Sequence, residues 1–105
     1  MSELLDKQQQ FVVKIMDLIH YGLNHGMLFT FGEAFVNPVE SKRDPRSTHH
    51  FKLGIDLNLF VDGAYITDGS HKAFIKLHDY WDFLGGAKRI EDDMNHFSVG
   101  WKNYR

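Results

Sequence analysis

An acidic residue within an apolar run is the first feature of this sequence with chemical consequences. Residues 53–61 alternate between apolar and other side chains, and Asp56 lies near the middle of them. A buried carboxylate must be paired, protonated or bound to a metal ion, because burying a bare charge is expensive. Backbone N–H groups, or an arginine of the preceding loop such as Arg43 or Arg46, suit that role as well as a metal ion does.

Two histidines are candidates to share a metal ion with Asp56. His49 lies seven residues before it, and His96 lies near the end of the chain. Two imidazoles and one carboxylate are a common zinc-binding set that leaves the fourth position to water. His50 shares the strand parity of Asp56, whereas His49 needs a bulge or a non-extended loop to reach the same side, so spacing alone does not choose between them. The chain has no cysteine, so nitrogen and oxygen must hold any metal.

A second acid lies close to the last of these histidines. Asp93 precedes His96 by three residues. A carboxylate beside the open position of a metal can take a proton from the bound water and pass it to a leaving amine. The alternative is that residues 91–93, which are all acidic, form a solvated turn, as most charge runs do.

Composition indicates one ordinary globular domain. The chain has 105 residues, of which 43% are hydrophobic and 25% charged, and this length suffices for a single core. A net charge of -2 argues against a nucleic-acid partner, which would need a broad basic surface. The most apolar stretch, residues 11–19, is interrupted by Lys14 and Asp17, so we expect neither a membrane span nor a secretory signal, and we expect synthesis in the cytoplasm.

The apolar periodicity predicts the elements that must position these residues. Residues 3–24 read as an amphipathic helix, capped by Ser2 and ended by Gly26, and residues 27–31 read as a short strand. The prolines and polar residues of 37–48 predict a surface loop. The expected apolar face of the first helix comprises Leu4, Phe11, Ile15, Ile19 and Leu23.

The second half of the chain predicts a hairpin, a helix and a final strand. The strand 53–61 turns at Asp62-Gly63 into a return strand, 64–67. Ser70 is the expected N-cap of a helix that runs to about residue 84, residues 88–93 form a loop, and 95–101 form the last strand. Residues 1–105 therefore predict one α+β domain, in which a small, mainly antiparallel sheet with a central hairpin packs against two to three helices. The expected core aromatics are Trp81 and Phe97, and we expect four histidines to be surface or packing residues: His20, His25, His71 and His78.

The order of these motifs resembles one family of zinc peptidases. Ser47-Thr48-His49 is followed by an Asp seven residues after that His, by the hairpin Asp62-Gly63-Ala64-Tyr65, by Trp81, and by Asn95-His96-Phe97-Ser98 after Asp93. This pattern is similar to that of the D-alanyl-D-alanine carboxypeptidases and dipeptidases and the phage L-alanyl-D-glutamate endolysins, which trim peptidoglycan stems. The likeness extends from the first helix, through residues 30–34, to Trp101.

The resemblance assigns roles to individual residues. It implies that His49, Asp56 and His96 bind Zn²⁺ and that Asp93 is the general base. It also implies that Ser47 lies beside the substrate or the metal. The family often carries an arginine shortly after the Gly-Glu-Ala segment, but this chain has Phe35-Val36-Asn37 there, and Arg43 or Arg46 would have to replace it near the substrate or the oxyanion.

The expected activity is hydrolysis of peptidoglycan stem peptides, most simply by an endolysin that cuts the L-Ala–D-Glu bond. A D-Ala-D-Ala carboxypeptidase or dipeptidase is the enzymatic alternative. The non-enzymatic alternative is a cell-wall-binding module in which the zinc only stabilises the fold. As an endolysin, a monomer made in the cytoplasm would reach the wall through a holin-type partner that breaches the membrane.

Overall fold

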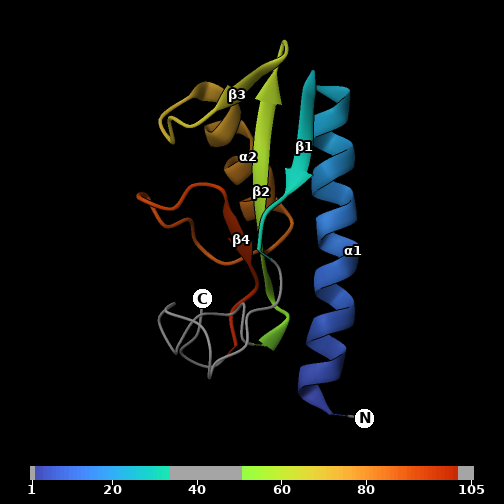
Figure 1. The fold of residues 1–105 in the computed structure, drawn as a ribbon. Coiled ribbons are helices and arrows are strands. Elements are labelled where there is room, and N and C mark those ends of the chain that lie inside the picture. Colours follow the sequence, from blue (N-terminus) through green and yellow to red (C-terminus); the bar gives the residue numbers. More distant parts are fainter. Residues whose placement is uncertain (1, 34–50, 102–105) are drawn as a thin grey trace.

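The computed structural model describes residues 2–33 and 51–101, and it confirms an α+β fold (Figure 1). Two helices and four short strands make up the described part, and the strands form an antiparallel sheet. The elements in chain order are α1 (Glu3–Asn24), β1 (Met27–Phe31), β2 (Gly54–Val61), β3 (Ala64–Ile66), α2 (Lys72–Phe83) and β4 (His96–Ser98).

Strand β2 is the centre of the sheet. Its second half pairs with β1 along one edge, from Leu57↔Phe31 to Val61↔Met27. The other edge is shared by two strands, because β4 pairs with Gly54–Asp56 and β3 pairs with Leu59–Val61. Residues 57–58 therefore lie where β3 and β4 part, and the hydrogen bond from Leu57 N to the Asn95 carbonyl, 2.8 Å, is the last link on the β4 side.

The first helix has the predicted bounds and, apart from Leu23, the predicted apolar face. Ser2 Oγ accepts a hydrogen bond from Leu5 N at 3.1 Å, as expected of an N-cap. The side chain of Leu23, predicted to be buried, is 49% exposed. Phe11 and Ile15 are buried, and Leu4 and Ile19 pack against the core, as predicted. Leu18 and Gly22 extend this buried line. Gly22 belongs to that line because the ring of Phe29 in β1 occupies the space where a Cβ would lie.

The hairpin is confirmed, whereas the predicted cap of α2 is wrong. Asp62 and Gly63 both have positive φ, as a two-residue turn of the favoured twist requires. The N-cap of α2 is His71, whose Nδ1 accepts from Ala73 N at 3.0 Å. Ser70 lies one residue too early: its N–H and hydroxyl both donate to Asp68 Oδ1, which closes the preceding turn and lowers the pKa of Asp68.

Both helices cover the same face of the sheet. In Figure 1, α2 lies behind the strands and α1 runs beside β1, and the two helices meet where the ring of Phe11 contacts Trp81 edge-on. Trp81 and Phe97 are fully buried on this side, as predicted. Side chains alternate along a strand, so the neighbours of Phe97 in β4 face the other way. No helix within residues 2–33 and 51–101 is long and apolar enough to cross a membrane.

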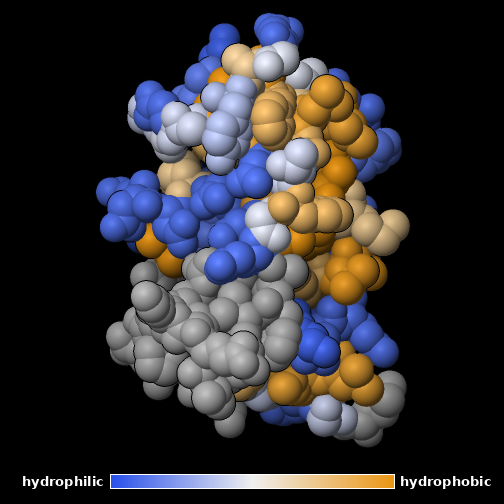
Figure 2. Space-filling view, in the orientation of Figure 1, coloured by the Kyte–Doolittle hydropathy of each residue, from blue (hydrophilic) through white to orange (hydrophobic). Residues whose placement is uncertain are grey.

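The surface opposite the helices is divided by polarity. Figure 2 shows hydrophilic side chains gathered at mid-height, where the segment after α2 lies, and hydrophobic ones over β1 and α1. The acids Glu91 and Asp92 are exposed in the first region. Among the described residues, the segment between α2 and β4 is thus the hydrophilic part of this face.

Candidate active site

Asp56 and His96 are brought face to face by the sheet. They are direct cross-strand partners in the β2–β4 pairing, so both side chains stand on the face opposite the helices. The two residues are only 8% and 5% exposed, respectively. His96 Nδ1 lies 3.4 Å from Asp56 Oδ1. The sheet register thus unites two of the three residues that the sequence proposes as metal ligands.

The separation of these two atoms suits a shared metal ion. A charge-assisted N–H···O bond is usually shorter, about 2.7–2.9 Å. Two ligand atoms that each lie about 2.0–2.1 Å from one tetrahedral zinc ion are about 3.4 Å apart. An imidazole nitrogen and a carboxylate oxygen are also donor types that Zn²⁺ accepts. The described donors therefore fit zinc in both chemistry and spacing.

The backbone of Asp56 is hydrogen-bonded to residues 32–33 along the edge of β2 that faces β1. Gly32 N donates to the Asp56 carbonyl at 2.8 Å, and Asp56 N donates to the Glu33 carbonyl at 2.8 Å. A Cβ on Gly32 would lie 2.9 Å from the Asp56 Cβ and 3.3 Å from its carbonyl oxygen. Only glycine permits this close approach, which explains why the chain at 32–33 can run directly against the acid.

Gly32→Ala is expected to disturb the site locally. The added methyl group must push β2 and the segment after β1 apart, because the atoms it meets are the Cβ and backbone of Asp56. Overpacking of this kind costs about 1–3 kcal/mol of the free energy of unfolding. Thermal unfolding would give that cost, and zinc titration of the folded variant should show weaker binding. Unchanged stability and zinc affinity would contradict the close approach.

Asp93 lies in the turn that leads into β4, three residues before His96. Its backbone N–H donates to the Ile90 carbonyl at 2.9 Å, and its own carbonyl accepts from His96 N at 3.0 Å. Asp93 is partly buried, whereas Glu91 and Asp92 are exposed. Residues 91–93 are thus not one uniformly solvated turn. The partly buried acid among them is Asp93, the proposed general base.

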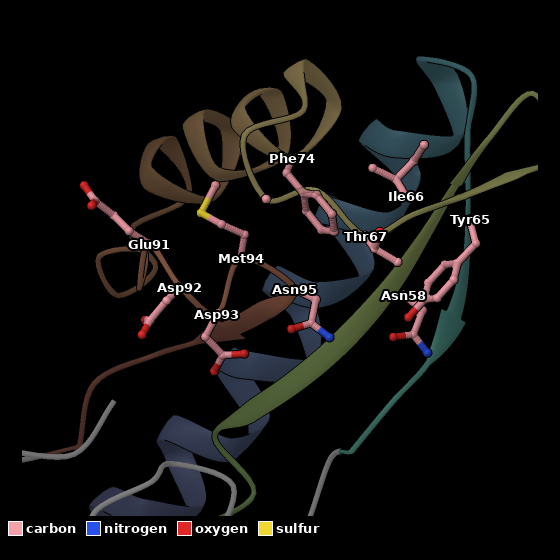
Figure 3. A pocket seen from close by; sticks show the side chains of 11 residues that line it. Asn58, Tyr65, Ile66, Thr67, Phe74, Glu91, Asp92, Asp93, Met94 and Asn95 are labelled. Carbon is pink, nitrogen blue, oxygen red and sulfur yellow. The ribbon is translucent and has the colours of Figure 1, made fainter.

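A cavity of about 290 Å³ adjoins Asp93. It lies where β3 and β4 part, between β2, the start of α2 and the turn before β4 (Figure 3). Asn58 lines it from β2, and the Asn58 amide donates to Thr30 Oγ1 at 3.2 Å. Its remaining polar lining includes Tyr65, Thr67, Glu91, Asp92 and Asn95. In Figure 3 Asp93 and Asn95 lie on the β2 side of the turn, whereas Glu91 points away. The cavity can hold a polar chain beside Asp93.

The other predicted site residues lie outside the described residues. These are the third proposed ligand, His49, its alternative His50, and the proposed substrate-side residues Ser47, Arg46 and Arg43. Within residues 2–33 and 51–101, no three His, Asp or Glu side chains are grouped as a metal site needs. The described part of the candidate site is thus Asp56, His96 and Asp93.

The remaining histidines are surface or packing residues, as predicted, but one of them has a buried polar contact that the sequence analysis did not anticipate. His20 and His25 are exposed, and His71 caps α2. His78 is fully buried, and its Nε2 lies 2.7 Å from the Met94 carbonyl. Burial, the largest cause, lowers the pKa of His78 and keeps the ring neutral. In the sequence, the burial of His78 is indicated only by its position between Leu77 and Trp81, which lie on the apolar face of the helix.

The candidate site thus consists of a buried Asp–His pair, a partly buried acid in the turn beside it, and a polar cavity against that turn. These features are consistent with metal-assisted hydrolysis. The chain matches no protein-family model and no curated protein.

Proposed function

We propose that this protein is a zinc-dependent peptidase that hydrolyses peptidoglycan stem peptides, cutting the L-Ala–D-Glu bond as an endolysin does. The observation that carries the proposal is the buried pair of Asp56 and His96, 3.4 Å apart, with Asp93 in the turn beside it. Added to it is the resemblance of the motif order to the peptidoglycan-trimming zinc peptidases. His49 completes the proposed ligand set.

Each residue has a separate task in this proposal. Asp56 and His96, with His49, would hold the zinc, and a zinc ion bound there would supply a Lewis acid for the scissile carbonyl and a bound water with a pKa of about 7. Asp93 takes a proton from the attacking water and gives it to the amine that leaves when the C–N bond breaks. The polar cavity lined by Asn58 and Thr67 receives the peptide on one side of the scissile bond. No covalent enzyme intermediate is needed.

Retention of an acid at position 93 favours an enzyme over a zinc-stapled binding module. A structural zinc site has four protein ligands and needs no base beside it. Asp93 is partly buried and fixed by backbone hydrogen bonds on both sides, although the neighbouring acids point into solvent. This placement suits a group that exchanges protons with a ligand.

The test is mass spectrometry of the soluble fragments released from purified peptidoglycan. The zinc-loaded protein is compared with a chelated sample and with Asp93→Ala. We expect zinc-dependent release of stem peptides that begin at D-Glu. Loss of terminal D-Ala alone would instead identify a carboxypeptidase. Absence of cleavage by a protein with one bound zinc would overturn the enzymatic proposal in favour of a binding module.

A further inference from the structure

His78 contacts the segment of the proposed active site from the core side. It lies on α2, is completely buried, and its ring stacks on that of Phe97 with centroids 4.3 Å apart and planes 13° apart. Phe97 directly follows His96 in β4. The imidazole therefore packs against the back of the strand whose front carries the proposed ligand.

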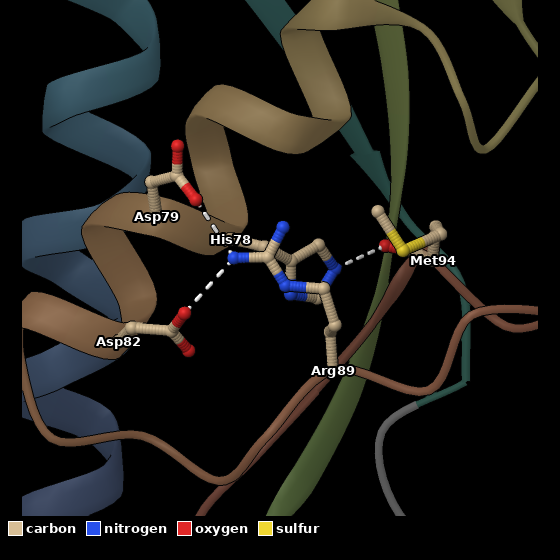
Figure 4. Close-up of polar contacts among 5 residues, drawn as sticks. All are labelled: His78, Asp79, Asp82, Arg89 and Met94. Atoms are coloured by element: carbon tan, nitrogen blue, oxygen red, sulfur yellow. Dashed lines mark hydrogen bonds and ion pairs between the residues drawn. The ribbon is translucent and has the colours of Figure 1, made fainter.

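The same ring also binds the turn before β4. His78 Nε2 lies 2.7 Å from the Met94 carbonyl, and since a carbonyl only accepts, Nε2 must carry the hydrogen (Figure 4). Met94 lies between Asp93 and His96 and is itself buried. One side chain thus holds the backbone at position 94 and the ring at position 97, which bracket the proposed ligand.

A second contact ties the same region to α2. The Arg89 guanidinium donates to Asp79 Oδ1 at 2.8 Å and to Asp82 Oδ2 at 2.9 Å, so the segment that follows α2 is fastened back onto the helix (Figure 4). Burial and, to a smaller extent, the charge of Arg89 lower the pKa of His78, whereas the Met94 carbonyl and Asp82 act in the opposite direction. A neutral ring has one N–H, and the Met94 carbonyl fixes it on Nε2.

We infer that His78 is a positioning residue of the active site, which holds the turn that carries Asp93 and the strand that carries His96. The expected effect on zinc binding and activity rests on the proposed function. The anchoring of the turn and the strand rests only on the contacts of His78 with Met94 and Phe97. Residues that orient metal ligands typically contribute about 10–100-fold to metal affinity or activity. Without the imidazole N–H, the Met94 carbonyl is left without its buried donor and the turn loses its anchor.

The experiment compares three single variants. His78→Phe keeps an aromatic ring against Phe97 but removes the donor, whereas His78→Gln restores an N–H donor of similar reach. Leu77→Ala is the matched control, because it truncates a fully buried side chain of the same helix that faces Gly22 of α1. Amide hydrogen exchange is measured on the metal-free proteins, and zinc affinity is measured by competition with a chelator.

In His78→Phe we expect faster exchange of the Asp93 and His96 amides and a zinc affinity that is 10–100-fold lower. His78→Gln should recover much of both, while Leu77→Ala should lose stability without these effects, because its side chain faces α1. Equal amide exchange and equal zinc affinity in His78→Phe and Leu77→Ala would overturn the inference. If the wild-type protein binds no zinc and cleaves nothing, the proposed function fails, but the exchange comparison still tests the positioning role.

A measurement on the wild-type protein covers the case in which His78→Phe does not fold. Nitrogen NMR of the histidine rings distinguishes the two neutral tautomers. We expect His78 to carry its proton on Nε2 and to exchange that proton slowly. A ring protonated on Nδ1, or a rapidly exchanging Nε2 proton, would contradict the hydrogen bond to Met94 and with it the inference.

Discussion

Asp93→Ala is expected to lower the rate of stem-peptide hydrolysis by about 10²–10⁴-fold, which is the usual contribution of a general base. The bound zinc should remain, because Asp93 is proposed to act beside the metal and not to bind it. The fold should also remain, since the hydrogen bonds that fix the turn at Asp93 come from its backbone N–H and carbonyl. The measurements are kcat, zinc content and thermal unfolding of the same preparation.

Asp92→Ala is the matched control for this prediction. It removes a carboxylate of the same charge from the adjacent position, but from an exposed side chain. Asp92 lines the cavity that is proposed to receive the peptide, so its loss should change KM. We expect its kcat to stay close to that of the wild-type protein. Equal losses in the two variants would mean that the general negative charge of the turn matters and not a positioned base. Wild-type activity of Asp93→Ala would refute the assigned mechanism.

The local elements of the fold could be predicted because local signals agree on them. The first helix combines a capping Ser2, a periodic apolar face and Gly26 beyond its end, and its observed bounds equal the predicted ones. The hairpin at Asp62-Gly63 combines strand alternation with a turn sequence that accepts positive φ. Each of these signals acts within a few residues, so no knowledge of the tertiary structure is needed.

The errors in the fold arise from contacts between elements. Leu23 continues the apolar period of α1 but is exposed, because β1 packs the ring of Phe29 against Gly22 instead. Ser70 is a good capping residue by type, yet Asp68 binds its hydroxyl and the helix begins after His71. Neither competing contact can be read from helical periodicity.

In the candidate site, too, the sequence indicates single residues but not the contacts between elements. Asp56 stands out in sequence as an acid in an apolar strand, and His96 as a candidate partner, but only the β2–β4 register makes them neighbours. The burial of Asp56 agrees with its place in an apolar run, whereas the backbone bonds that join it to Gly32 and Glu33 have no signal in the sequence. The contact of His78 with Met94 joins residues 16 positions apart and has no sequence signature of its own.

His96→Ala is expected to have the largest combined effect on metal binding and stability. Zinc binding should be lost, because the variant removes one of the two proposed ligands that the sheet register brings together. The metal-free protein should also be less stable by about 1–3 kcal/mol, since a buried imidazole that lies 3.4 Å from Asp56 Oδ1 is removed from the site. Zinc titration and urea unfolding of the metal-free protein measure the two effects separately.

The control is the double variant Asp56→Ala/His96→Ala, with Asp56→Ala as the fourth corner of the cycle. If the two side chains stabilise each other, the loss of stability in the double variant should be smaller than the sum of the two single losses. All three variants should fail to bind zinc. If His96→Ala kept wild-type zinc affinity, the ligand assignment would be wrong; if the two single losses of stability simply added, the side chains would not be energetically coupled. A coupled pair that also controls zinc binding would establish the metal centre on which the proposed hydrolysis depends.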